Sequence, residues 1–197
     1  MLMTAMDRET QAALQQGFKY LNRYMVLMWR LGLGKWLNSA PTLLGRYMVI
    51  VNVGRKSGQK RFAPVNYALA DGQVYCVAGF GAGSHWYQNI MATPQVELWL
   101  PDGRWSAQAV DVTDSDDASA KIRQVLIASA FVAPLVGIDP HTMPDAELAA
   151  ATADYRLIRF ERGESITGTN GPGELAWVWP LLGLVLLLAL RGQKRRK

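Results

Sequence analysis

The chain has 197 residues, half of them hydrophobic, which suits one folded domain with a short appendage and excludes wholesale disorder. Its net charge of +5 comes from the last seven residues, which hold five bases and no acid; removing those five from 21 basic residues leaves 16, equal to the 16 acidic residues. A body that binds nucleic acid is therefore not indicated. The single cysteine, Cys76, excludes a disulfide framework and a CxxC metal site, and two distant histidines do not make a metal centre.

The N-terminal segment, residues 1–45, is predicted to contain an amphipathic helix over residues 7–37. Apolar side chains recur at helical spacing and basic ones gather on the opposite face, as in Phe18, Leu21, Met25, Met28 and Trp29 against Lys19, Arg23 and Arg30. A surface helix that caps the core is the favoured interpretation. A basic helix that lies on an anionic membrane is the alternative. Acidic and basic residues precede any apolar run, so a secretory signal is not expected and the body should fold in the cytoplasm.

Residues 46–162 are predicted to form one antiparallel β-barrel. Six segments have β-branched or alternating patterns, namely 47–53, 62–69, 73–78, 95–100, 104–112 and 155–160. Asp71-Gly72 and the run 101–103 are tight-turn sequences between them. Two helices are expected over 84–92 and 115–130. Successive hairpins with two helical interruptions favour an α+β fold built on a small antiparallel barrel over a parallel sheet.

The C-terminal part is predicted to be a polar, Gly-rich linker, residues 163–174, followed by a hydrophobic helix with a basic tail, residues 175–197. Residues 175–190 carry no charge and are apolar on every side. A helix of that length is only ~24 Å long, short of the ~30 Å hydrocarbon core. We expect association with the cytoplasmic face of the cell membrane, either as a transmembrane anchor or as a shallow insertion, and keep packing on the body or in an oligomer as the alternative.

The strongest functional pattern is the basic turn over residues 54–61. Four cations and a serine lie between two predicted strands, together with two glycines and no acid. Glycine allows backbone N–H groups to approach an anion, while arginine and lysine supply charge. A basic hairpin tip is more often simply solvated, so the pattern alone favours an exposed turn, with an anion site as the alternative.

A Gly-rich loop, residues 79–84, follows one strand and precedes the short helix. Glycines at such a junction suit close approach of a ligand to backbone N–H groups. Trp86 or Tyr87 could stack on a flat ring, with the other in the core. We find no paired carboxylates and no nucleophile with a neighbouring base, so no catalytic side chain is predicted and a cofactor is expected to carry the chemistry.

Taken in order, these motifs resemble one known family. GRKSGxxR at 54–61, Pro64-x-x-Tyr67, the Asp71-Gly72 turn, AGFG at 78–81 and WYxNIxAxP at 86–94 are similar to the deazaflavin-dependent nitroreductase and quinone reductase family. The resemblance covers about residues 23–112. It implies a split β-barrel that uses reduced coenzyme F-420, a deazaflavin with a phosphate and a polyglutamate tail.

The resemblance implies an F-420-dependent oxidoreductase that transfers hydride to a quinone, a nitro compound or another small electrophile at the membrane. It also implies the cofactor-binding residues, which are Arg55, Lys56, Ser57, Gly58, Lys60, Arg61, Pro64, Tyr67, Ala78, Gly79, Phe80, Gly81, Trp86, Tyr87 and Asn89. An FMN-binding split-barrel reductase and a non-catalytic, membrane-tethered module for anions or lipid headgroups are the alternatives. The sequence leaves open whether the chain forms a homodimer, and it does not specify the hydride acceptor.

Overall fold

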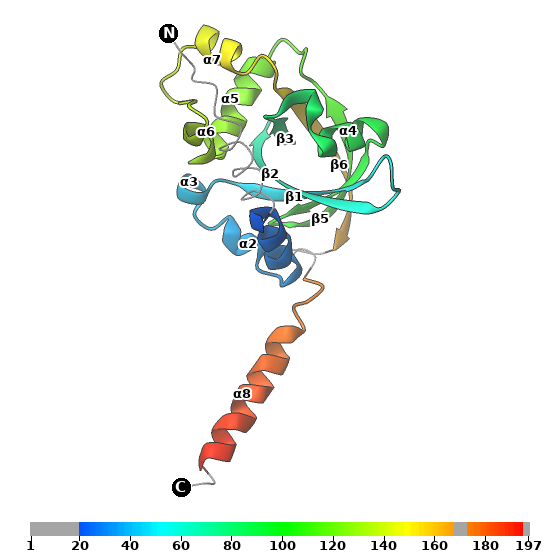
Figure 1. Ribbon diagram of the computed structural model, residues 1–197, viewed down its shortest axis with the longest axis vertical. Helices are drawn as coiled ribbons and strands as arrows, with labels where there is room; N and C mark the ends of the chain where they lie inside the picture. The colour runs from blue at the N-terminus through cyan, green and yellow to red at the C-terminus, as the bar shows by residue number, and fades with distance from the viewer. Residues whose placement is uncertain (1–19, 168–172, 195–197) are drawn as a thin grey trace.

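The computed structural model describes residues 20–167 and 173–194 and shows a closed barrel of six antiparallel strands (Figure 1). The strand order is β1-β2-β3-β6-β5-β4, and β1 also pairs with β4 to close the barrel. The strands are β1 (Tyr47–Val53), β2 (Lys60–Ala70), β3 (Gln73–Ala78), β4 (Gln95–Leu100), β5 (Gly103–Asp111) and β6 (Arg156–Thr167). The α+β class and the antiparallel barrel predicted from the sequence are thereby confirmed.

The last strand is longer than predicted. β6 continues to Thr167, into the segment predicted as linker, because its backbone goes on pairing with β5. Ser165 lies opposite Trp105 and Thr167 opposite Arg104, after a bulge in the register. The expectation of a linker beginning at residue 163 was therefore wrong for residues 163–167, while residues 168–172 lie outside the described part.

The barrel interior forms the main core. Alternate residues of each strand point inward, and in β3 these are Val74, Cys76 and Ala78, as the alternation predicted. Phe160 and Ile158 of β6 and Leu98 of β4 are fully buried in the same cluster. Burial of such side chains contributes about 1.5–3 kcal/mol each.

Short helices cover the barrel. α4 (His85–Ala92) follows the 3-10 turn η1 (Gly81–Gly83) and buries Ile90 in the barrel core. α5 (Ala118–Ala128) packs on β2 and β3, with α6 (Val132–Leu135) and α7 (Asp145–Ala151) beside it. α6 and α7 were not predicted from the sequence. The buried Lys121 of α5 pairs with Asp71 in the β2–β3 turn, so that this helix is joined to the hairpin.

Residues 20–30 form a helix that packs on the outside of β1 and β4. Met25 and Trp29 are buried, and Trp29 contacts a cluster with Val49, Val51 and Trp99. The surface-helix interpretation is confirmed for these residues, while residues 7–19 of the predicted helix lie outside the described part. Two short helices, α2 (Gly34–Leu37) and α3 (Pro41–Leu44), lead to β1.

The C-terminal helix α8 (Val178–Lys194) extends away from the body (Figure 1). Residues 173–179 join it to the turn after the helix at 20–30: the Leu175 N–H donates to the Arg30 carbonyl at 2.8 Å, and Trp179 Nε1 donates to the Leu31 carbonyl at 2.9 Å. Beyond this joint the apolar side chains of residues 181–190 are exposed. Within residues 20–167 and 173–194, no helix is long and apolar enough to cross a membrane, so the expectation of a transmembrane helix is not supported.

Candidate functional site

The basic segment covers the turn between β1 and β2, residues 54–59, and the first two residues of β2, Lys60 and Arg61. The Gly54 N–H donates to the Gln59 carbonyl at 2.8 Å, and the Gly58 N–H donates to the Gly54 carbonyl at 2.8 Å. Gly58 has φ of +65°, a conformation that favours glycine. All four cations of the segment, Arg55, Lys56, Lys60 and Arg61, are exposed. Across the described residues, none of the four forms an ion pair with a carboxylate, which leaves their charge available to an anionic ligand.

Arg55 connects this turn to α4. Its Nη1 donates to Asn89 Oδ1 at 3.2 Å, and its backbone N–H donates to the same oxygen at 3.2 Å. Its Nη2 donates to Gln88 Oε1. The backbone and the guanidinium of Arg55 are therefore both fixed by one helix, and the charge is held in a defined place without being neutralised.

Asn89 is in turn held by Asn52 of β1. Asn89 Nδ2 donates to Asn52 Oδ1 at 2.9 Å, and both side chains are buried, with 6% and 2% of their surface exposed. Because Asn89 Oδ1 accepts from both the backbone and the guanidinium of Arg55, Asn89 positions Arg55, while one N–H of its amide nitrogen is bonded to Asn52. Sequence reasoning missed Asn52 and Gln88. The one sequence signal for Asn52 is that it is a polar residue within the otherwise apolar run of β1.

The Gly-rich loop lies beside the same network. Gln88 Nε2 donates to the Ala82 carbonyl at 2.9 Å, so Gln88 joins the loop to Arg55. Gly81 has φ of +61°, and a Cβ there would lie 2.5 Å from the Asp154 carbonyl oxygen, so a side chain would not fit. Phe80 between the two glycines is 78% exposed and contributes nothing to the core.

The start of α4 holds polar groups without partners. Ser84 precedes the helix, yet its hydroxyl does not cap it, and Ser84 Oγ is buried without a hydrogen-bond partner. The first N–H groups of any helix lack intrahelical acceptors and favour negative charge. The N-terminus of α4, together with the Arg55 guanidinium that Gln88 and Asn89 of this helix hold, suits a phosphate or carboxylate group of a ligand.

Trp86 and Tyr87 are both half-buried and pack against the barrel core. The Tyr87 hydroxyl donates to Asp111 Oδ2 at 2.5 Å, which joins α4 to the end of β5. Burial and the hydrogen bond to Asp111 raise the pKa of Tyr87 to about 12. Burial also acts to raise the pKa of Asp111, but hydrogen bonds from Thr113 and Tyr87 outweigh it, and that pKa is lowered. Tyr87 is therefore protonated and Asp111 ionised at neutral pH.

The predicted site residues thus divide into two groups. The turn, the loop and α4 meet around Arg55 and bring together residues that lie far apart in the sequence. Pro64, by contrast, pairs with Val49 within the β1–β2 ladder, and Tyr67 and Ala78 are buried in the barrel core. The roles of all these residues in binding a cofactor remain predictions.

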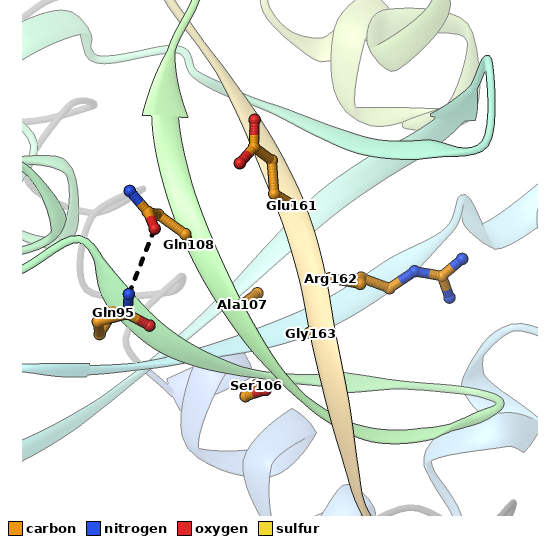
Figure 2. A pocket seen from close by; sticks show the side chains of 7 residues that line it. All are labelled: Gln95, Ser106, Ala107, Gln108, Glu161, Arg162 and Gly163. Carbon is orange, nitrogen blue, oxygen red and sulfur yellow. Dashed lines mark hydrogen bonds between the residues drawn. The ribbon is translucent and has the colours of Figure 1, made fainter.

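A hollow of about 240 Å³ lies elsewhere, on the surface of β4, β5 and β6 (Figure 2). Its lining is mostly polar and consists of Gln95, Ser106, Ala107, Gln108, Glu161, Arg162 and Gly163. It coincides with the bulge in the β5–β6 register, where a Cβ on Gly163 would lie 2.7 Å from Ser106 Oγ. None of the residues predicted to bind a cofactor lines it. Nor do the described residues contain a group of three or more side chains suited to hold a metal ion.

Comparison with known proteins identifies one family model that matches residues 30–132, described as F-420H(2)-dependent quinone reductase. Among solved structures, an F-420-H2-dependent reductase is 21% identical, with 59% of this chain and 94% of that chain covered and a TM-score of 0.40. A conserved hypothetical protein of Mycobacterium tuberculosis is 17% identical, with 60% and 74% covered and a TM-score of 0.45. The heme storage protein of Vibrio cholerae is 12% identical, with 65% and 89% covered and a TM-score of 0.45.

Proposed function

Because the chain belongs to the F-420H(2)-dependent quinone reductase family, we propose that it transfers hydride from reduced coenzyme F-420 to a quinone, a nitro compound or another small electrophile at a membrane surface. The family makes the protein an oxidoreductase with coenzyme F-420 as its cofactor. What we propose beyond the family assignment is the hydride acceptor and the location of the reaction at a membrane.

The observation that carries the proposal is the position of Arg55. Its guanidinium is fixed by Asn89 and Gln88 and pairs with no carboxylate of the described residues, and three further exposed cations follow within residues 56–61. A single phosphate does not need four cations, whereas a tail with a phosphate and several glutamates does. We assign Arg55, Lys56, Lys60 and Arg61 to that tail.

The loop and the start of α4 would hold the part of the cofactor nearer the ring. The Gly-rich loop and the first N–H groups of α4 offer backbone donors to the cofactor there. Exposed Phe80 and half-buried Trp86 supply aromatic surface for the ring or for a flat acceptor. The bound cofactor supplies the hydride, so the protein's part is to bind, to orient and to exclude water.

The membrane location is proposed from α8. Its exposed apolar residues occur on consecutive positions and therefore face every direction around the helix. A lipid phase covers such a helix on all sides, and the five bases of residues 191–197 favour an anionic leaflet. We propose a non-spanning insertion at the cytoplasmic face, where lipophilic quinones are accessible.

The test is turnover by the purified full chain with reduced F-420 or reduced FMN, and with a quinone or a nitro compound as acceptor. We expect oxidation of reduced F-420 that depends on the acceptor and falls in Arg55→Ala at subsaturating cofactor. Arg23→Ala, which removes an exposed arginine from the helix at 20–30, serves as the matched control. Turnover with FMN alone, or equal effects of the two variants, would contradict the proposal.

A further inference from the structure

The joint between α8 and the body, residues 30–37 and 173–179, carries an unusual set of tryptophans. Trp36 is 62% exposed, Trp177 58% and Trp179 44%. The other four tryptophans of the chain are buried or half-buried, including Trp29 and Trp99 in the core. We name the three exposed side chains at the joint the tryptophan collar.

The collar is held in place by backbone and side-chain contacts. Trp179 Nε1 donates to the Leu31 carbonyl, and the backbone N–H groups of Leu175 and Trp36 are bound within the joint. A Cβ added to Gly32 would lie 3.5 Å from the Ala176 Cβ, so the two segments are in close contact. The collar therefore lies where α8 leaves the body, with Trp177 and Trp179 beside the beginning of α8 and Trp36 in α2, shortly after the turn at residues 31–32 that contacts this segment.

The charge around the collar is basic. The joint has one acid, Glu174, which pairs with Arg30 at 3.2 Å and lies 3.7 Å from Arg104. Lys35, next to Trp36, is exposed and forms no ion pair within the described part of the chain. An exposed lysine beside tryptophans complements an anionic phospholipid surface.

We infer that the tryptophan collar is a second lipid contact, which seats the body in the headgroup layer of an anionic bilayer while α8 occupies the apolar layer beneath. Tryptophan favours this boundary because its ring is apolar and amphipathic. A second protein copy would cover one side of α8, whereas the apolar exposure continues around it. This inference rests on the proposed membrane location, and it additionally identifies which part of the body contacts lipid.

The structure allows a clean labelling experiment. The only cysteine, Cys76, is buried, and burial raises the pKa of its thiol well above the usual value, so thiol reagents will not modify it. An environment-sensitive fluorophore can then be placed on Trp36→Cys at the collar, Leu184→Cys on α8, or Glu147→Cys on α7 as the control. α7 lies at the end of the body opposite α8 (Figure 1).

The labelled full chains are mixed with vesicles of equal parts phosphatidylcholine and phosphatidylglycerol. We expect the label at 36 to become protected from aqueous iodide and quenched by a headgroup-level quencher, the label at 184 to be quenched from the acyl chains, and the label at 147 to stay unchanged. Quenching at 184 with no change at 36 would overturn the collar but keep the membrane location. No change at either position would overturn both.

Alanine variants give a second readout. Trp36→Ala combined with Trp177→Ala should weaken vesicle partitioning of the full chain severalfold, because both side chains are exposed and contribute little to folding. Leu135→Ala, which removes an exposed apolar side chain from α6, should leave partitioning unchanged. Equal partitioning of the collar variant and the unmodified chain would contradict the inference.

Discussion

Arg55 is the residue at which the three sequence motifs meet. The basic turn contains it, α4 holds it through Asn89 and Gln88, and Gln88 connects it to the Gly-rich loop. A fixed guanidinium loses little further side-chain entropy on binding an anion. Arg55 therefore acts as the organising cation of the site, and the exposed lysines add charge around it.

Asn89→Ala is expected to weaken cofactor binding because it releases Arg55. The change leaves the Arg55 N–H and Nη1 without their acceptor, and it leaves the buried Asn52 Oδ1 without its donor. A buried unsatisfied group such as Asn52 Oδ1 costs about 1–3 kcal/mol. Melting temperature and the dissociation constant for F-420 should both worsen, and an unchanged dissociation constant would show that Asn89 does not position Arg55.

Ser57→Ala and Cys76→Ala are expected to keep most of their turnover at saturating cofactor. Ser57 Oγ accepts only long hydrogen bonds, at 3.4 Å from Gln59 and Arg61, and Cys76 is a buried thiol in the barrel core. Among the contacts of the described residues, Ser57 has no base to activate it, and burial keeps the Cys76 thiol protonated and out of reach. Steady-state kinetics with reduced F-420 would check this, and loss of turnover in a folded variant would refute it.

At the scale of elements, the contact between α4 and β5 depends on pH. The pKa of Asp111 is lower in the folded chain than in the unfolded chain, so its stabilising contribution is complete above the unfolded value of about 3.9 and is lost as pH falls through the folded value. Tyr87, whose pKa is raised to about 12, stays protonated throughout this acid range.

We therefore expect Asp111→Asn to lower the melting temperature at pH 7, and we expect this effect to decrease as pH falls below about 4 toward the lowered pKa of the folded carboxyl. Thermal unfolding of both proteins between pH 7 and pH 3 would check it. The same temperature difference at both ends of this range would show that the charge of Asp111 does not stabilise the α4–β5 contact.

The barrel was predictable because its strands alternate and its turns carry turn residues. β1 and β3 match their predicted bounds, and Asp71-Gly72 forms the β2–β3 turn. α6 and α7 are too short to show a helical period, and the end of β6 is polar and reads as linker although it pairs with β5. At α6, α7 and the end of β6, contacts with the rest of the fold determine the secondary structure, which the local sequence pattern does not show.

The candidate site was predictable only in part, because its contacts join residues that are distant in the sequence. The basic turn, the Gly-rich loop and α4 are visible as motifs, but no sequence pattern shows that Arg55 contacts α4. Asn52 and Gln88 act only through contacts with residues distant in the sequence. The motif also does not show that barrel closure buries Tyr67 in the core, and its role in cofactor binding stays a prediction.

At the scale of the whole molecule, the body and α8 meet only through a small joint in the described part. Truncation after Trp179 keeps the contacts of Glu174, Leu175 and Trp179 and removes the exposed apolar helix. We expect a folded protein that binds F-420 as the full chain does. At high salt it should no longer sediment with membranes, whereas the full chain should still do so.

Sedimentation with and without high salt, together with a thermal melt, would check the truncation. The retained collar permits only a weak, salt-sensitive association with lipid. A truncated chain that unfolds would show that α8 belongs to the core or to an oligomer. Full-length protein that stays in solution without detergent would contradict the membrane part of the proposal.

The central claim, that the basic turn binds the anionic tail of F-420, is tested most directly by fluorescence titration of the full chain with three ligands: F-420, the same deazaflavin without its phosphate and glutamates, and FMN. We predict that F-420 binds tightest of the three ligands. Arg55→Ala and Lys56→Ala should each reduce the affinity for F-420 about ten- to a hundredfold, because a charge-assisted contact contributes about 1.5–3 kcal/mol. Both variants should leave the affinity for the tail-less ring almost unchanged. Unchanged F-420 affinity in both variants, or equal affinity for F-420 and the tail-less ring, would contradict the assignment.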